Sequence, residues 1–325
     1  ALLNFHHEPV TACYFATQKV LTLARTKLRG MLPVYEADVR PTDRYLMERF
    51  ITAGVRVKGE AVFVDESGSN LQSGQSFINP RLEPAEYQPT LTIASLDIET
   101  SYTENILYSI AVHSGLEDKV FMVGRGDSSL SYLEYAPTER LVIERFLDWF
   151  AHLDPDVIIG WSVVGFDLDF LQKRCDVLSI PFTLVREENV VSWRNDPRRP
   201  GRRYALVPGR VALDGIELLR TATYQLESFA LDFVSNQLLG RGKLIHDVDA
   251  RASEIQELYA SDPDQLARYN LEDCVLVKEI FDHTDLFSFA MERSRLTGLD
   301  MDRAGGSVAA FDYLYLPRLH RQGYV

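Results

Sequence analysis

The chain contains 325 residues, of which 46% are hydrophobic and 25% are charged, as in globular proteins with a sizeable core. No apolar run approaches the ~20 residues that a helix needs to cross a bilayer, so a membrane-spanning helix is excluded. The 47 acidic residues outnumber the 34 basic ones, and the resulting charge of −13 argues against a non-specific binder of duplex DNA.

The three cysteines, Cys13, Cys175 and Cys274, stand far apart in the sequence. Their number and spacing predict neither a disulfide framework nor a cysteine-based zinc site, and they are typical of a reducing cytoplasm. The chain shows no signal peptide, begins without Met and stops at Val325, so we expect it to be a piece of a longer protein.

Short segments bounded by glycine or proline make up the first 90 residues. The breakers are Gly54, Gly59, Gly68, Gly74 and Pro80. Their spacing predicts short strands and turns over residues 1–90. Pro80, Pro84 and Pro89 then predict a linker, because proline disfavours both helices and central strands.

From Leu91 onward the pattern changes to strands that alternate with helices. Short apolar runs predict strands over 91–98, 106–112, 120–123, 156–160 and 207–213. Helical periodicity predicts helices over 137–152, 166–177, 227–239 and 252–291, the last with a break near Pro263. This order predicts an α/β domain of about 200 residues.

The first motif is the sequence SLDIET at residues 95–100, in the first of these strands. Residues two apart on a strand share a face, so Asp97 and Glu99 project together while Leu96 and Ile98 point to the other side. Two carboxylates at the end of a buried strand are costly unless they bind something positive. Taken alone, a solvated strand end is the simpler explanation.

The second motif, GWSVVGFD at residues 160–167, follows a buried strand and leads into a helix. Asp167 is therefore expected near a helix N-terminus, where both the helix dipole and capping favour an acid. Capping would be enough to explain this residue by itself.

The third motif, YNLED at residues 269–273, falls within the last predicted helix. Residues four apart on a helix share a face, so Tyr269 and Asp273 are expected to point the same way. An exposed helix face is the ordinary explanation when this segment is considered alone.

Together the three motifs favour a metal site over these separate explanations. Carboxylates at such positions can hold two divalent ions about 3.5–4 Å apart, the arrangement used for in-line attack on phosphodiesters. Mg²⁺ suits this role, with Mn²⁺ as a substitute, because it prefers oxygen ligands and keeps bound waters. The candidate site residues are Asp97, Glu99, Asp167, Tyr269 and Asp273.

These three motifs resemble the exonuclease motifs of the DEDD superfamily, in its tyrosine-bearing branch. More closely, they are similar to the proofreading domain of family B DNA polymerases. The resemblance extends to VYEADVRP at residues 34–41 and RYLMERF at residues 44–50, which are particularly similar to bacterial members of that family. It covers most of residues 34–325.

The resemblance implies a domain arrangement. A ribonuclease H-like exonuclease domain, with a mixed sheet flanked by helices, would occupy residues 91–297 of this α/β chain. A smaller β-rich N-terminal domain would occupy residues 1–90, and residues 298–325 would return toward it and toward a polymerase palm. The palm motifs of the types DxxSLYPS and YGDTDS do not occur in this sequence, so we do not expect the chain to polymerise.

The resemblance also implies roles. Asp97 and Asp273 would bind one ion, Glu99 would help to hold it and orient the attacking water, and Asp167 would bind the second. Tyr269 would hydrogen-bond the water or the scissile phosphate. The implied activity removes 5′-nucleoside monophosphates from the 3′ end of DNA. The resemblance further implies a bacterial, cytoplasmic and nucleoid-associated enzyme. Its implied partners are a single-stranded 3′ end, a primer–template and, through a region absent from this chain, a sliding clamp.

One position departs from the family pattern. The family places Asn five residues before the second-motif Asp, and this chain has Ser162 there. Serine offers one hydroxyl on a shorter stem in place of an amide, so we expect weaker strand binding and reduced nuclease activity. Phe166 is interpreted either as a residue that stacks on a base or as a core residue.

A basic segment lies between the second and third motifs, where residues 186–210 contain seven arginines and three acids. The family has a β-hairpin in this region, and arginine combines phosphate contacts with stacking, so we interpret the segment as a DNA-contacting hairpin. A solvated hairpin is the alternative. The arginines assigned to DNA are Arg194, Arg198, Arg199, Arg202 and Arg203.

Two other functions remain open. One is a free-standing RNA-processing exonuclease of the ribonuclease D class, against which the VYEADVRP segment argues. The other is a DNA-guiding module whose nuclease is weakened by Ser162, against which the four intact acids argue.

The negative net charge of the chain does not exclude DNA binding, because residues 246–285 contribute eleven acids and three bases around the proposed metal site.

Overall fold

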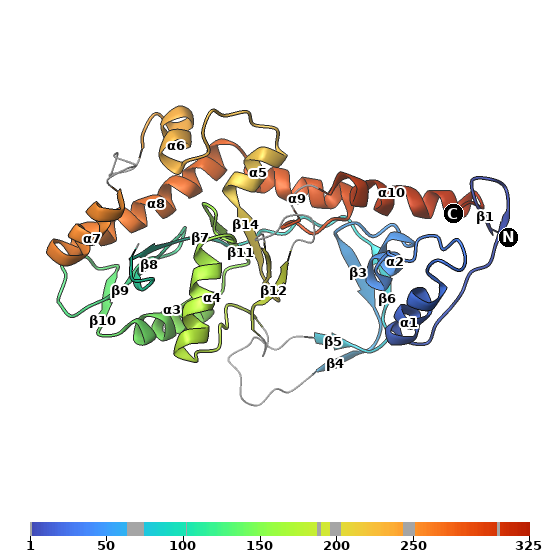
Figure 1. Cartoon of the computed structure of the whole chain (residues 1–325), viewed down its shortest axis with the longest axis horizontal. Helices are drawn as coiled ribbons and strands as arrows, with labels where there is room; N and C mark the ends of the chain where they lie inside the picture. The colour runs from blue at the N-terminus through green and yellow to red at the C-terminus, as the bar shows by residue number, and fades with distance from the viewer. Residues whose placement is uncertain are drawn as a thin grey trace. The chain divides into compact units, whose positions relative to one another are not determined.

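The computed structural model describes residues 2–63, 75–101, 103–186, 190–195, 203–242, 251–303 and 306–325. The chain forms two compact units, one from residues 1–89 and 291–325 and the other from residues 90–290 (Figure 1). Across the described residues, no helix is long and apolar enough to cross a membrane.

A six-stranded mixed sheet forms the centre of the 90–290 unit. In spatial order its strands are β10 (Leu133–Ala136), β9 (Asp118–Val123), β8 (Leu107–Ser114), β7 (Ile93–Thr100), β11 (Val157–Gly160) and β14 (Val211–Asp214). The central strand β7 runs antiparallel to β8 and parallel to β11. Because β7, β11 and β14 are parallel, their carboxyl ends meet at one edge, where ligands of such sheets bind.

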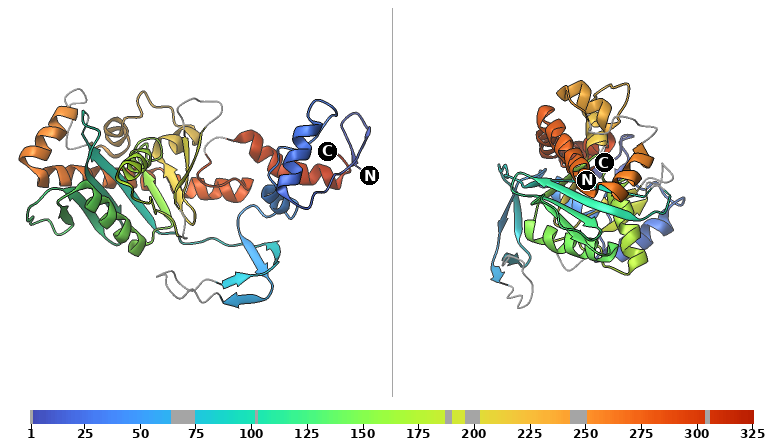
Figure 2. Two further views of the ribbon diagram at one scale, coloured as in Figure 1. Left: turned by 60° about the horizontal axis from the view of Figure 1, so that its bottom comes forward. Right: turned by 90° about the vertical axis from the view of Figure 1, so that its left-hand side faces the viewer.

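Helices cover both faces of this sheet (Figures 1 and 2). On one face lie α3 (Glu139–Leu153) and α4 (Asp167–Leu178), and on the other α7 (Arg251–Ser261) and α8 (Pro263–His283). The unit also contains α5 (Gly215–Thr221) and α6 (Leu231–Leu239), and α9 (Leu286–Thr297) follows α8. The sheet is therefore buried on both sides.

Alternation along the strands divides the apolar side chains between two cores. Leu96 and Ile98 of β7 belong to the cluster that packs with α3 and α4. Ala111 of β8 and Met122 of β9 belong to a second cluster with α8. Full burial of a large aliphatic side chain contributes roughly 1.5–3 kcal/mol, so these two cores fix the position of β7 between the helices.

The predicted elements of this unit are confirmed to within a few residues for β7, β8, β9, β11, α3, α4 and α6. The strand predicted over 207–213 is wrong in extent. Residues 207–210 form a turn, in which the N–H of Arg210 donates to the carbonyl of Val207 at 2.9 Å. Gly209 has a φ of +80° in this turn, so the strand begins only at Val211.

Two short elements of this unit were not predicted. The edge strand β10 has four residues, and α5 has seven. α5 begins because the side chain of Asp214 accepts the N–H of Glu217 at 3.1 Å. Both elements are too short for a periodic pattern to identify them.

In its described residues, the unit formed by residues 1–89 and 291–325 contains three antiparallel strand pairs. β1 (Leu2–Leu3) pairs with β2 (Pro9–Val10), β3 (Val55–Lys58) with β6 (Arg81–Pro84), and β4 (Ala61–Phe63) with β5 (Gln75–Phe77). Short pairs of this kind are marginal by themselves and need packing partners.

The same unit contains α1 (Gln18–Leu28), α2 (Pro41–Met47) and α10 (Ser307–Arg321). The prediction of strands and turns alone over residues 1–90 is therefore wrong for the first two helices. Thr17 caps α1 by accepting the N–H of Val20 at 3.3 Å, and Pro41 begins α2. These start signals lie in segments without a long apolar period, so periodicity did not identify the helices.

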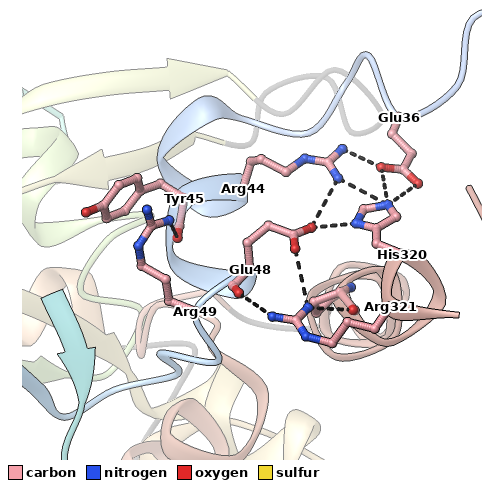
Figure 3. A network of polar contacts seen from close by, with 8 residues as sticks. Glu36, Arg44, Tyr45, Glu48, Arg49, His320 and Arg321 are labelled. Carbon is pink, nitrogen blue, oxygen red and sulfur yellow. Dashed lines mark hydrogen bonds and ion pairs between the residues drawn. The ribbon is translucent and has the colours of Figure 1, made fainter. Parts of the chain in front are cut away.

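Charged side chains join α2 to α10 (Figure 3). The ring of His320 lies between two carboxylates, with Nδ1 against Glu48 and Nε2 at 2.9 Å from Glu36. Arg44 pairs with Glu36, and Arg321 donates to the backbone carbonyl of Glu48 at 2.8 Å. The segment around α2 and the end of α10 are therefore held together within one unit.

Candidate metal centre

Two carboxylates of the candidate site come from β7. Because Leu96 and Ile98 face the core beneath α3 and α4, Asp97 and Glu99 face the opposite side, which α8 covers. Asp97 is half-buried and Glu99 is only 7% exposed. Buried carboxylates are costly unless hydrogen bonds or positive charge compensate them, so this pair requires such compensation.

α8 supplies the third carboxylate. The helix begins after Asp262, whose side chain accepts the N–H of Gln265 at 3.1 Å, and continues across the sheet. Asp273 on this helix is 1% exposed. Oxygen atoms of Asp97, Glu99 and Asp273 lie within 4.8 Å of one another, close enough for one cation to contact all three.

Asp167 is the first residue of α4 and lies beside the same strand. Its Oδ1 accepts a hydrogen bond at 3.1 Å from the backbone N–H of Ile98, the residue between Asp97 and Glu99. Its Oδ2 is buried and has no hydrogen-bond partner within the described part of the chain. The N-cap position of α4 belongs to Phe166, so capping alone does not explain the acid.

The turn before α4 depends on a close backbone approach at Gly160 and on a left-handed backbone conformation at Ser162. A Cβ at Gly160 would lie 2.7 Å from the carbonyl oxygen of Leu96 and 2.7 Å from the Cβ of Val163, so only glycine fits where β11 approaches β7. Ser162 has a φ of +64°, in the left-handed region, and its carbonyl accepts the N–H of Phe166 at 2.9 Å. This tight turn brings the start of α4 against β7.

Burial and like charge dominate the electrostatics of the site. Burial, followed by the nearby Asp97 carboxylate, raises the pKa of Asp167 well above its ordinary value. Burial also raises the pKa of Asp214, at the end of β14, to about 6. A raised pKa means that the anion is disfavoured, and a bound cation reverses that preference. The buried Oδ2 of Asp167 and the three clustered carboxylates therefore fit an oxygen-preferring divalent ion such as Mg²⁺.

A buried amide beside the site was not predicted from the sequence. Nδ2 of Asn270 donates to Oδ2 of Asp97 at 2.7 Å, and Oγ of Ser109 donates to Oδ1 of Asn270 at 2.8 Å. Both Asn270 and Ser109 are fully buried. The only signal in the sequence was the place of Asn270 in the YNLED motif.

Tyr269 lies one turn before Asp273, and both side chains are buried. The tyrosine is 1% exposed and belongs to the cluster that includes Tyr108, Ala111 and Met122 of the sheet. Its ring is therefore held in the core between α8 and the sheet. A contact between its hydroxyl and a substrate stays a prediction.

The predicted hairpin has two short strands, β12 (Ser192–Asn195) and β13 (Arg203–Leu206), which pair antiparallel. Arg194 is exposed. Phe166, the N-cap residue of α4, is also exposed, with 48% of its surface accessible. The three other arginines assigned to DNA lie outside the described residues, namely Arg198, Arg199 and Arg202.

Side chains of the hairpin bind α4. The guanidinium of Arg203 lies 4.4 Å from the ring centre of Trp193 and pairs with Asp169 of α4. Trp193 in turn donates from Nε1 to Oε1 of Gln172, also on α4, at 3.0 Å. The base of the hairpin is therefore fixed to the helix that begins with Asp167.

Two further arginines of the basic segment have partners in the fold. Arg186 pairs with Asp154 at 2.8 Å and with Asp156 at 2.7 Å. Arg210 is buried and pairs with Asp154 at 2.8 Å. We therefore assign these two arginines to the fold.

Comparison with known proteins supports the resemblance that the motifs indicated. A family model described as "DNA polymerase family B, exonuclease domain" matches residues 32–234. DNA polymerase II of Escherichia coli (strain K12) is 43% identical over the whole of this chain and 41% of its own length. A DNA polymerase of Thermococcus sp. (strain 9oN-7) is 32% identical over 68% of this chain and 28% of its own length.

The fold has a solved counterpart. The family B DNA polymerase of Pyrobaculum calidifontis aligns with a TM-score of 0.71 and 20% identity over 94% of this chain and 39% of that one. The match confirms the expected ribonuclease H-like arrangement of a mixed sheet flanked by helices. The chain spans about two fifths or less of the length of these relatives.

Proposed function

The chain belongs to the exonuclease domain family of the family B DNA polymerases, and from this membership we propose that its 90–290 unit is a 3′→5′ exonuclease acting on DNA. The observation that supports this most directly is the approach of Asp97, Glu99 and Asp273 to within 4.8 Å, with Asp167 hydrogen-bonded to the same strand. Such a carboxylate site is suited to metal-assisted hydrolysis of a phosphodiester.

In this proposal Asp97, Glu99 and Asp273 hold one divalent ion and Asp167 holds a second. Bound Mg²⁺ supplies stabilisation of the negative charge that develops on the phosphate, and it acidifies water. Glu99 orients the attacking water, and the Tyr269 hydroxyl hydrogen-bonds either the water or the phosphate. The water oxygen forms a bond to phosphorus while the bond to the 3′ oxygen breaks and that oxygen gains a proton. The products are a 5′-nucleoside monophosphate and a strand with a new 3′ hydroxyl.

The DNA strand would reach this site past exposed and partly exposed groups on the same unit. Phe166 next to Asp167 offers a ring on which a terminal base can stack, and Ser162 offers a hydroxyl near the same turn. Arg194 on the hairpin offers an exposed charge for the backbone phosphates. The substrate we propose is thus a single-stranded 3′ end, presented by a primer–template in the bacterial cytoplasm.

Polymerisation and clamp binding would belong to other parts of a longer polymerase. The chain spans 41% of the length of E. coli DNA polymerase II, and the palm motifs are absent from its sequence. The alternative of a ribonuclease D-class enzyme is disfavoured, because the family model matches residues 32–234, which include the first two motifs. The alternative of a DNA-guiding module with weakened nuclease predicts the same DNA contacts and a slower reaction.

Digestion of a 5′-labelled single strand in Mg²⁺ tests the proposal. We expect wild type to give a ladder that shortens from the 3′ end and releases 5′-monophosphates, and EDTA to abolish it. The Asp97→Ala/Glu99→Ala variant is expected to lose the ladder. A control that also loses two acids, Glu144→Ala/Asp148→Ala on the exposed side of α3, is expected to retain it. A ladder that persists in the first variant contradicts the assignment.

An RNA strand of the same sequence separates the enzyme classes. We expect DNA to be degraded faster than RNA. Faster degradation of RNA would favour the ribonuclease D class instead. DNA binding with only slow metal-dependent cleavage would favour the DNA-guiding module.

A further inference from the structure

A chain of two hydrogen bonds links the interior of the sheet to Asp97. The hydroxyl of Ser109, on β8, donates to the carbonyl oxygen of Asn270, on α8, at 2.8 Å. The amide nitrogen of Asn270 then donates to Oδ2 of Asp97, on β7, at 2.7 Å. Ser109 and Asn270 are both 0% exposed, so water does not compete for these hydrogen bonds.

The chemistry of the three groups fixes the direction of this chain. An ionised carboxylate only accepts hydrogen bonds, so the NH₂ end of Asn270 must face Asp97. The carbonyl end then faces Ser109, whose hydroxyl can rotate to donate to it. Reversal of the amide would place two acceptors against each other at Asp97, so Asp97 sets the orientation of the amide, and the hydrogen bond from Ser109 holds its carbonyl end in place.

We propose that Asn270 is a positioning residue that holds the Asp97 carboxylate in the orientation for cation binding, with the hydrogen bond from Ser109 holding the far end of the Asn270 amide in place. This proposal deepens the function proposed above and rests on it. Asn270 does not touch the ion or the substrate. It limits rotation of the Asp97 carboxylate, so the site is organised before the ion arrives. Removal of such a partner behind a metal ligand typically costs 10–100-fold in metal affinity.

Ser95, a second buried serine on the strand next to that of Ser109, provides a matched control. Ser95, on β7, is 0% exposed like Ser109, and its hydroxyl has no hydrogen-bond partner among the described residues. Ser95→Ala and Ser109→Ala thus delete the same buried atom type from adjacent strands of one sheet. Only Ser109 is connected to Asp97 through Asn270.

The test is the affinity of the 325-residue chain for Mn²⁺, measured by isothermal titration calorimetry without nucleic acid. We expect Asn270→Ala to weaken binding by about 10–100-fold. We expect Asn270→Leu, which keeps the volume but not the amide, to weaken binding similarly. Ser109→Ala is expected to weaken binding by a smaller factor, and Ser95→Ala is expected to leave it unchanged.

A double variant separates positioning from general loosening of the core. If Ser109 acts through Asn270, then Ser109→Ala has no further effect on Mn²⁺ affinity once Asn270 is Ala. Multiplicative losses in the double variant would overturn the proposal. Circular dichroism of each variant identifies any that fails to fold. If an Asn270 variant does not fold, the comparison of Ser109→Ala with Ser95→Ala still tests the proposal, because each of these changes removes only one oxygen atom.

The possible failures are distinguishable. In one outcome, wild type binds Mn²⁺ and Asp97→Ala/Glu99→Ala abolishes binding, but both Asn270 variants bind like wild type. The positioning role of Asn270 is then wrong, and the metal site is retained. If wild type does not bind Mn²⁺, or if Asp97→Ala/Glu99→Ala still binds it, the proposed function and the positioning role both fail.

Discussion

The side chain of Asp167 accepts a hydrogen bond at 3.1 Å from the backbone N–H of Ile98. Ile98 lies between Asp97 and Glu99 on β7. This hydrogen bond therefore fixes the start of α4 beside those two acids. Neighbouring residues of a strand present their side chains to opposite faces, whereas the N–H groups lie in the plane of the sheet. Asp167 therefore binds β7 between its core-facing and site-facing side chains.

Substitution of Gly160 is expected to disturb this arrangement. Gly160→Ala places a Cβ 2.7 Å from the carbonyl oxygen of Leu96, so we expect a loss of about 1–3 kcal/mol in the free energy of unfolding. Urea denaturation measures it. Gly115→Ala, where the new Cβ meets nothing within 4 Å, is the control and is expected to change stability by less than about 0.5 kcal/mol. Equal effects at the two glycines would contradict the close approach.

The partly buried Asp214 carboxyl is expected to make stability depend on pH. Burial raises its pKa from 3.8 to about 6, so the folded state binds the proton more tightly than the unfolded state. The stabilisation is complete below pH 3.8 and is lost as pH rises through about 6. Relative to Asp214→Asn, which keeps an N-cap side chain, wild type is expected to lose ~3 kcal/mol across that window.

Urea denaturation of the metal-free chain between pH 4 and 7 measures this difference. Asp148→Asn, at an exposed position on α3, is the control and is expected to follow wild type. Parallel curves for wild type and Asp214→Asn would show that the Asp214 carboxyl does not titrate in this range.

Ser162 is expected to accept asparagine without backbone strain. Its φ of +64° is in the left-handed region, which Asn adopts more readily than most residues. Ser162→Asn is expected to keep the stability and to bind a single-stranded oligonucleotide about 2–10-fold more tightly, as one added hydrogen bond allows. Fluorescence anisotropy in EDTA measures the affinity without cleavage. Unchanged affinity would mean that this side chain does not contact the strand.

Arg194 is expected to contribute one phosphate contact. Its side chain is exposed on the hairpin, whereas Arg203 is bound by Trp193 and Asp169. Arg194→Ala is expected to reduce the slope of log affinity for single-stranded DNA against log salt by about 0.7. Anisotropy titrations at several salt concentrations measure it. Arg194→Lys retains the charge and is expected to retain the slope, so an equal reduction in both variants would argue against a phosphate contact.

His320 is expected to stabilise the pairing of α10 with α2. Its ring contacts Glu48 and Glu36 (Figure 3), and its side chain is only 15% exposed. His320→Ala leaves both carboxylates without this partner, so we expect a loss of about 2 kcal/mol and faster hydrogen exchange in α10. Arg295→Ala removes an exposed pair with Glu292 in the same unit and is expected to leave exchange in α10 unchanged. Unaltered exchange in His320→Ala would mean that the network does not hold the helix.

Much of the fold followed from local patterns. Alternation over residues 93–100 placed Asp97 and Glu99 on one side of β7, and a spacing of four placed Tyr269 and Asp273 on one side of α8. The sequence before Asp167 predicted a helix start, which α4 confirms. Periodicity missed α1, α2, α5, α10 and β10, because short or weakly buried elements carry little periodic signal.

By itself the sequence therefore determined which acids are present, which of them share a strand or a helix, and the family to which the chain belongs. Only the tertiary structure decided which groups meet. The hydrogen bond from Asn270 to Asp97 joins residues 173 positions apart, and that from Ile98 to Asp167 joins residues 69 positions apart. The spacing of residues along a strand or a helix shows which face of that element a side chain occupies. The partner across that face is set by strand pairing and helix packing, because the two buried cores fix β7, α4 and α8 against one another.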